Sequence, residues 1–161
     1  MKTTIRNFGR VNDSFYRGAQ PRVEEYAQLA GMGVRTVIDL CDVDDKQSYA
    51  RAAAEKAGLS YLWLPMSDRK YPAADTAPTF LDISRHTGTP VFVHCAGGRH
   101  RTGAMTAVYR LQVDKWSLKR AMREMESYFG WPVWVHWAGH TKIRDFVKDY
   151  WDDISRTYHV G

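Results

Sequence analysis

The sequence has little cysteine, no long apolar run and no apolar leader. Its two cysteines, Cys41 and Cys95, are too few for a disulfide framework. No stretch of about 18 apolar residues occurs, so none predicts a membrane-spanning helix. The first ten residues contain no apolar core of the kind found in signal peptides. These absences predict a cytoplasmic protein, and leave export open if a leader was removed.

The sequence also lacks repeats, linkers and blocks of like charge. It has 23 basic and 18 acidic residues, a net charge of +5. A basic balance favours an anionic partner, but without a run of five like charges we expect no nucleic-acid tail. A chain of 161 residues, 44% of them hydrophobic, can form a sizeable core. We therefore expect one domain over residues 1–161, and a monomer.

The most informative stretch is residues 94–102, His-Cys-Ala-Gly-Gly-Arg-His-Arg-Thr. An apolar run at 90–93 precedes it and a helix-forming run at 103–111 follows, which predicts a strand, a tight loop and a helix. Gly97 and Gly98 allow the backbone to curl. Backbone N–H groups from Ala96 onward can then converge on one anion at the helix N-terminus.

The side chains of this loop indicate attack on phosphorus. Cys95 lies where N–H groups favour its thiolate, so we expect its pKa to fall below the free value of about 8.5. Arg101 offers a guanidinium fork that fits a tetrahedral oxyanion. The hydroxyl of Thr102 can hydrogen-bond the thiolate and help it leave a phosphocysteine. The alternatives are a buried structural cysteine beside an unrelated arginine, and a pseudophosphatase that binds phosphate without chemistry.

The pattern His-Cys-x-x-Gly-x-x-Arg-Thr resembles the signature of the cysteine-dependent protein tyrosine phosphatase superfamily. Cys95, Gly98, Arg101 and Thr102 match its defining positions. Low-molecular-weight phosphatases and arsenate reductases share a Cys-x5-Arg loop, but place it near the N-terminus. The resemblance covers roughly residues 15–128 and implies the small dual-specificity-phosphatase fold. That fold is α/β, with four or five mainly parallel strands and helices on both faces. No metal or cofactor is implied.

A phosphatase of this type needs a proton donor on a mobile loop. Residues 67–72, Ser-Asp-Arg-Lys-Tyr-Pro, resemble the Thr-Asp-His-x-Trp-Pro loop of the PTP-like phytases. The resemblance gives Asp68 the role of general acid and Arg69 the place of a substrate-contacting histidine. Asp75 is the competing candidate for the acid. The implied reaction is attack by Cys95, protonation of the leaving alcohol by Asp68, and hydrolysis by water that Asp68 activates.

Several basic residues predict a rim that binds more than one phosphate. Arg99 and His100 lie within the loop, and Arg69 and Lys70 follow the candidate acid. Arg17 belongs to a run similar to the Tyr-Arg-small-x-Gln-Pro entry of small atypical phosphatases. It is a further candidate for the anion site, with a solvated arginine at a strand end as the alternative.

The His-Arg-Thr ending of the loop resembles that of plant and fungal phosphatases acting on inositol pyrophosphates. The expected substrate is therefore an inositol polyphosphate, as for the PTP-like phytases. The alternatives are a tyrosine or dual-specificity phosphoprotein phosphatase, and a non-enzymatic module that binds phosphate or nucleic acid.

Elsewhere, the sequence predicts one short edge strand within residues 7–20 and an irregular, packed aromatic segment at 130–137, with a pocket wall as its alternative. Asp42, Asp44 and Asp45 are expected in a solvated turn rather than a metal site. Cys41 ends a predicted strand. By analogy with other superfamily members it could pair with Cys95 under peroxide, the alternative being a small buried hydrophobe.

Overall fold

The computed structural model describes residues 3–43 and 45–158, and Asp44 lies outside the described residues. A five-stranded sheet forms its centre, in the order β1-β2-β5-β3-β4. The strands are β1 (Gly9–Asn12), β2 (Phe15–Ala19), β3 (Thr36–Asp39), β4 (Ser60–Trp63) and β5 (Val91–Cys95). Only β1 and β2 pair antiparallel, and all other pairs are parallel. The predicted mainly parallel sheet is confirmed.

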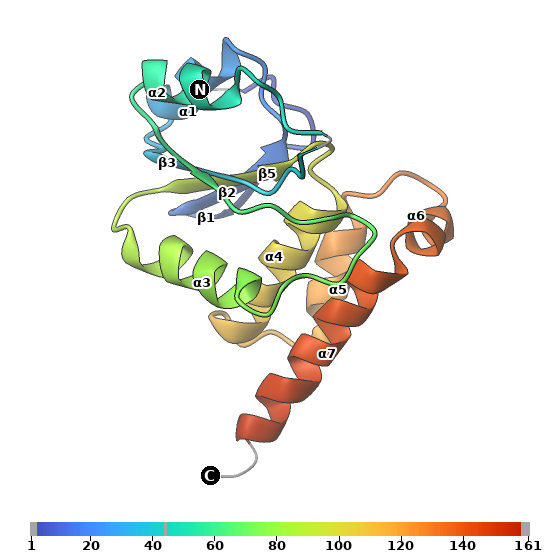
Figure 1. The fold of residues 1–161 in the computed structure, drawn as a ribbon. Coiled ribbons are helices and arrows are strands. Elements are labelled where there is room, and N and C mark those ends of the chain that lie inside the picture. Colours follow the sequence, from blue (N-terminus) through green and yellow to red (C-terminus); the bar gives the residue numbers. More distant parts are fainter. Residues whose placement is uncertain (1–2, 44, 159–161) are drawn as a thin grey trace.

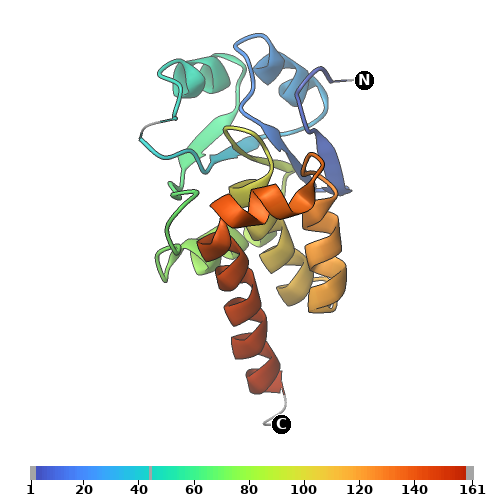
Figure 2. The same cartoon turned by 90° about the vertical axis from the view of Figure 1, so that its right-hand side faces the viewer.

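Helices cover both faces of this sheet (Figure 1). On one face lie α1 (Glu25–Gly31) and α2 (Ala50–Lys56), and on the other α3 (Thr76–His86), α4 (His100–Gln112), α5 (Leu118–Glu126) and α7 (Thr141–Tyr158). The short α6 (Val133–Gly139) lies across the upper end of α7 (Figure 2). The predicted α/β class is thereby confirmed. None of the helices in the described ranges is both long and apolar enough to cross a membrane.

The central position of β5, between helices on both faces of the sheet, explains why its sequence is apolar without alternation. Val91 and Val93 pack into the core beneath α3, α4, α5 and α7, whereas Phe92 packs into the core beneath α1 and α2. All five residues of β5 are buried. Because β2, β3 and β5 are parallel, their carboxyl ends meet at one edge of the sheet, where ligands of such folds bind.

Two parts of the fold differ from the sequence prediction. Residues 9–19 form a hairpin rather than one edge strand, because the Asn12 side chain accepts a 2.8 Å hydrogen bond from the Ser14 N–H and turns the chain. The second strand of that hairpin, β2, lies inside the sheet beside β5.

The aromatic segment after α5 is the second difference. It is mostly the helix α6, not an irregular stretch. Trp131 and Trp134 are 92% and 69% exposed, so the prediction that this segment packs against the protein was wrong for both. Trp137 does pack, edge-on against Phe129 at 5.0 Å between ring centroids.

Candidate active site

Cys95 is the last residue of β5, and residues 96–99 turn the chain directly into α4. The turn is tight: Gly98 has φ +69°, and a Cβ there would lie 2.4 Å from the Gly18 carbonyl carbon in β2. A side chain at this position would be strained by its backbone conformation and would clash with a fixed strand. The close approach of loop and strand therefore requires glycine at 98, whereas nothing lies within 4 Å of a Cβ built on Gly97.

The carbonyl groups of this loop are held by the surrounding framework. The Ala96 carbonyl accepts a hydrogen bond from the Gln20 N–H at 3.2 Å. The Gly97 carbonyl accepts from the Asn7 side chain at 2.7 Å, and the Gly98 carbonyl from the Arg17 guanidinium at 2.9 Å. All three donors belong to the N-terminal segment that includes β2. The loop carbonyls are thus bound on the side where that segment lies.

The N–H groups of the same loop are left without partners. From Ala96 to Arg99, none donates a hydrogen bond to any group in the described part of the chain. The following residues, His100, Arg101 and Thr102, form the first turn of α4, where helical N–H groups have no intrahelical acceptor. Satisfied carbonyls and unsatisfied N–H groups together make an anion site, which the positive end of the α4 dipole reinforces.

Arg101 lies next to this site and is only 5% exposed. Its guanidinium forms an ion pair with Asp45 and donates a 3.1 Å hydrogen bond to the Met66 carbonyl. Burial by itself would lower the pKa of Arg101, but its hydrogen bond to Asp45 and the negative charges of Cys95 and Asp45 outweigh burial and raise it. The guanidinium therefore stays charged, and its ion-pair partner in this structure is the Asp45 carboxylate.

A cavity of about 270 Å³ opens over the loop. It is lined by Asp45, Asp68, Cys95, Ala96, Gly97, Arg99, His100, Arg101 and His140. Asp68 is thus in the same cavity as Cys95, whereas Asp75 is exposed at the start of α3 and does not line it. That placement favours Asp68 over Asp75 as the acid, although its catalytic role stays a prediction.

Only some of the basic residues predicted to form the rim line the cavity. Arg99 and His100 line the cavity, whereas Arg69 and Lys70 are exposed and do not line it. Arg17 was predicted to face the anion or the solvent. It is fully buried instead, with its guanidinium over the Tyr128 ring at 3.7 Å. Burial lowers the pKa of Arg17. Its guanidinium donates to the Gly98 carbonyl, so Arg17 lies behind the loop rather than on its anion-facing side.

Thr102 is fully buried, and its hydroxyl makes no hydrogen bond to any described protein group. The structure therefore gives no hydrogen bond between this hydroxyl and Cys95, and its assistance to the thiolate stays a prediction.

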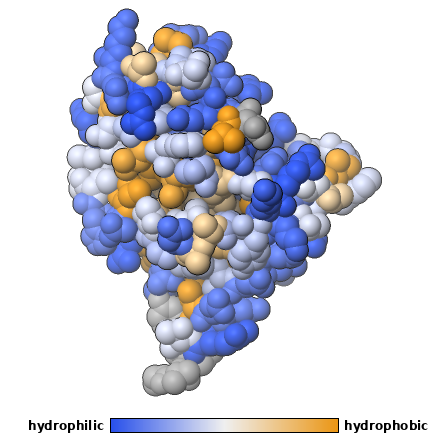
Figure 3. Space-filling model, viewed as in Figure 1, coloured by the Kyte–Doolittle hydropathy of each residue, from blue (hydrophilic) through white to orange (hydrophobic). Residues whose placement is uncertain are grey.

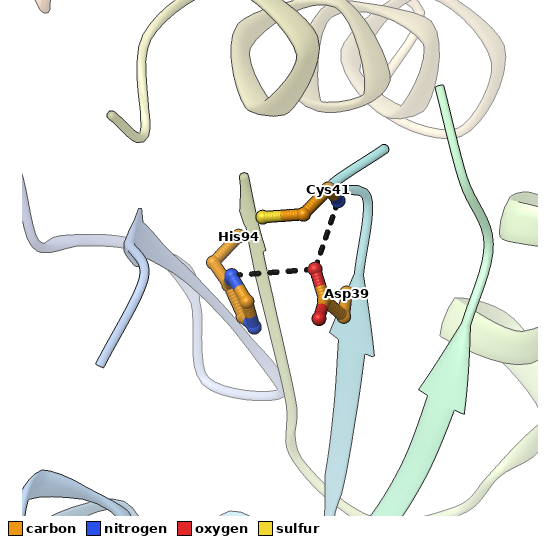
Figure 4. Close-up of side chains that lie close together, drawn as sticks. All are labelled: Asp39, Cys41 and His94. Carbon is orange, nitrogen blue, oxygen red and sulfur yellow. Dashed lines mark hydrogen bonds and ion pairs between the residues drawn. The ribbon is translucent and has the colours of Figure 1, made fainter. Parts of the chain in front are cut away.

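A buried polar group lies beneath the loop, formed by Asp39, Cys41 and His94 (Figure 4). The Asp39 carboxylate accepts a 2.8 Å hydrogen bond from the Cys41 N–H and a second one from the Tyr61 hydroxyl. His94 Nδ1 lies 3.8 Å from the same carboxylate, and burial lowers the His94 pKa. Asp39, at the end of β3, thus contacts both Tyr61 in β4 and His94, the residue before Cys95.

Both cysteines are free thiols in the structure. The Cys41 sulfur lies 3.3 Å from the Gln20 side-chain oxygen, to which its S–H donates. Burial, and then the Asp39 charge, raise the pKa of Cys41. A thiol with a raised pKa is a poor nucleophile in disulfide formation. The pairing of Cys41 with Cys95 under peroxide stays a prediction.

Sequence reasoning missed four residues at this site. Asp45 was expected in a solvated turn but pairs with Arg101, and Asn7 binds the loop carbonyl of Gly97. His136 and His140, from α6 and the residue after it, contact His100. All four are remote in sequence from residues 94–102, so no local motif indicates them.

Comparison with known proteins identifies the family. Residues 3–130 match a family described as "DSP-PTPase phosphatase fused to NAD+ Kinase". The chain belongs to this DSP-PTPase family. The resemblance to the protein tyrosine phosphatase superfamily is thereby confirmed.

Two relatives, one of them with a solved structure, illustrate the range of this family. The dual specificity protein phosphatase TpbA of Pseudomonas aeruginosa is 31% identical over 122 residues, 74% of this chain and 53% of TpbA. The inositol diphosphatase DSP3 of Arabidopsis thaliana is 27% identical over 131 residues, 77% of this chain and 63% of DSP3. A crystal structure of P. aeruginosa TpbA in complex with pTyr has a TM-score of 0.70 and 25% identity, covering 92% of this chain and 90% of that one. The chain spans only about half to two thirds of these curated relatives.

Proposed function

We propose that the protein is a cysteine-dependent phosphatase that hydrolyses inositol polyphosphates through a phosphocysteine intermediate. The observation that carries this proposal is the loop that follows Cys95. Its carbonyls accept hydrogen bonds from neighbouring segments, whereas its N–H groups have no partner among the described residues. Such a site stabilises the charge that develops on the equatorial oxygens of a transferring phosphoryl group. Residues 1–161 would form one domain for this reaction.

The reaction uses residues that share one cavity. The Cys95 sulfur attacks phosphorus while the loop N–H groups and Arg101 bind the three other phosphate oxygens. Asp68, across the same cavity, protonates the leaving oxygen and then takes a proton from the attacking water. Because phosphate and Asp45 would bind the same guanidinium, Asp45 has to yield part of its contact with Arg101 when the substrate enters.

The basic wall of the cavity supports a substrate with several phosphates. Arg99, His100 and His140 line it in addition to Arg101. At about 270 Å³, the cavity is slightly below the usual range of about 300–1,000 Å³ for ligand pockets, so it would enclose the reacting phosphate and its neighbours on the ring rather than the whole substrate. A relative named an inositol diphosphatase also points to this substrate class.

A second candidate is a phosphotyrosine protein. It is favoured by the relative named a dual specificity protein phosphatase and by the solved complex of that relative with pTyr. A protein substrate would place only its phosphorylated side chain in the cavity, and the remaining basic wall would then contact acidic neighbours in the peptide.

The test compares phosphate release from inositol hexakisphosphate with release from a phosphotyrosine peptide, using Cys95→Ser as the control. We expect a larger kcat/KM for the inositol, abolished in the variant. A larger kcat/KM for the peptide would favour the second candidate. Turnover of neither would leave a phosphate-binding module as the function, and in that case Cys95→Ser would bind inositol hexakisphosphate as the parent does.

A further inference from the structure

Three histidines from separate segments contact one another beside the cavity, and two of them, His100 and His140, line it. His100 is the first residue of α4, His136 lies in α6, and His140 lies between α6 and α7. The rings of His100 and His140 stack with 3.6 Å between centroids, and His100 Nε2 lies 3.1 Å from His136 Nδ1. We call these three residues the histidine cluster.

The hydrogen bonds of the cluster decide where its protons are. His140 Nδ1 lies 3.0 Å from the Asp68 carbonyl oxygen, which can only accept, so Nδ1 carries a hydrogen. In the neutral ring Nε2 then has a bare lone pair, and it makes no hydrogen bond within the described residues. Between His100 and His136, one nitrogen donates and the other accepts, so neither ring needs a second proton.

Within the cluster, His100 resists protonation. Burial, and after it the neighbouring His140, His136, Arg99 and Arg101 in that order, lower the pKa of His100 to about 3. These are the charged or titratable groups that face His100 from α4, α6 and the α6–α7 link. His140 additionally faces Asp68. An anion bound here would offset the positive charges of Arg99 and Arg101, so it would favour the protonated form of a neighbouring imidazole.

The side chain of Arg99 also indicates an anion site beside the histidine cluster. Arg99 lines the cavity beside His100 and His140, and its Nε is buried without any hydrogen-bond partner among the described residues. A buried guanidinium nitrogen without a partner is costly, so Arg99 gains if its side chain turns this nitrogen towards an acceptor in the cavity. An acceptor with negative charge would satisfy Arg99 and a protonated imidazole together.

We propose that the histidine cluster and Arg99 form a second anion site, which binds a neighbouring phosphate of a polyphosphorylated substrate and takes up a proton as it does so. This site deepens the proposed function, because it selects substrates with two or more phosphates at the same cavity. It also makes that selection stronger in mildly acidic solution, where the proton is available.

The test uses two sulfate probes, because sulfates do not titrate near neutral pH. Inorganic sulfate measures the loop site alone, and myo-inositol hexakissulfate can reach both sites. Each is measured as a competitive inhibitor of aryl-phosphate hydrolysis, and the ratio of the two Ki values is followed with pH. Effects of pH on Cys95 or on the loop enter both constants and cancel in the ratio.

The informative variant is His140→Asn, whose amide can still donate to the Asp68 carbonyl but cannot become a cation. Its matched control is His86→Asn in α3, because His86 is exposed and does not line the cavity. In the parent and the control, we expect the preference for the hexakissulfate to increase about tenfold from about pH 7.5 to about pH 5.5. In His140→Asn, we expect it to change less than about twofold.

A parent-like pH dependence in His140→Asn would overturn the second anion site. The outcome is separable from that of the proposed function. If inositol hexakisphosphate is not a substrate but the ratio depends on His140, the second site stands and the substrate class is wrong. If inositol hexakisphosphate is hydrolysed but the ratio does not depend on His140, the proposed function stands and the second site is refuted.

Discussion

The side chain of Asn7 donates a 2.7 Å hydrogen bond to the Gly97 carbonyl, joining residues that are 90 positions apart. Asn7 has φ 52°, a conformation that asparagine tolerates better than most residues. With Arg17 on the next carbonyl, this contact keeps two peptide groups of the loop oriented. Oriented peptides present their N–H groups to an anion before it arrives, so no reorganisation is needed during the reaction.

The first prediction concerns this contact. Asn7→Gly removes the amide without straining the backbone, and frees the Gly97 carbonyl to rotate. We expect kcat/KM to fall about tenfold, within the range for a lost positioning contact, with a small change in melting temperature. Steady-state kinetics and thermal unfolding on the same preparation measure both. Unchanged kinetics would show that the other tethers suffice to orient the loop.

The second prediction uses the two adjacent glycines as a matched pair. Gly98→Ala would place a Cβ 2.4 Å from the backbone of β2 at a positive φ, so either the strand or the loop has to move. We expect kcat/KM to fall at least about a hundredfold, because a displacement of about 1 Å can cost that much. Gly97→Ala meets nothing within 4 Å. It should therefore retain most of the activity, and equal losses in both variants would contradict this account.

The sequence predicts the fold and the centre of the site because both depend on local patterns. The apolar run of β5, the glycines of the loop and the helix-forming run after it occur within about twenty residues, and the structure has the elements they indicate. The position of Asp68 was also predictable, since it follows β4, whose parallel neighbour β3 pairs with β5.

The remainder depends on contacts between distant segments. Nothing near Asn7 or Asp45 in the sequence indicates that they reach residues 97 and 101. For Arg17 the sequence indicated either the anion site or a solvated strand end, and its burial follows only from the position of β2 inside the sheet. The aromatic residues at 130–137 suggested packing, but Trp137 is the one tryptophan of this segment that is buried, and Trp131 and Trp134 are exposed. The segment protrudes at the right of the molecule in Figure 3.

The third prediction concerns the ion pair between Arg101 and Asp45. The carboxylate competes with phosphate for the guanidinium, so removing its charge should strengthen anion binding. Asp45→Asn keeps an oxygen acceptor for Arg101, and we expect Ki for inorganic phosphate to fall about three- to tenfold, equivalent to about 1 kcal/mol. Asp42→Asn, in the same loop, should leave Ki unchanged. A higher Ki in Asp45→Asn would mean that the ion pair chiefly positions Arg101.

The fourth prediction separates the two candidate acids. Asp68 lines the cavity and Asp75 does not. Asp68→Asn should lower kcat for inositol hexakisphosphate about a hundredfold or more, because its alkoxide leaving group needs a proton. The loss should be much smaller for p-nitrophenyl phosphate, whose leaving group is stable without one. Asp75→Asn should resemble the parent with both substrates. A larger loss in Asp75→Asn, or equal losses of Asp68→Asn on both substrates, would contradict the assignment.

The last prediction is a pH dependence of stability. In the folded protein burial lowers the pKa of His100 to about 3, whereas in the unfolded chain it is about 6.5. Between these values the unfolded state binds the extra proton, so the free energy of unfolding rises with pH and the full contribution is present above about pH 6.5.

Replacing His100 should remove part of that dependence. In His100→Asn, we expect the loss of stability between about pH 7 and pH 5 to be smaller than in the parent by about 1 kcal/mol, below the limit of about 1.4 kcal/mol per pH unit for one proton. Urea unfolding at both pH values measures the difference. His86→Asn, which removes an exposed histidine of α3, should retain the parent's dependence. If both variants lose the same share of this pH dependence, then the cluster does not keep His100 unprotonated. The proposed uptake of a proton with a second phosphate would then lose its physical basis.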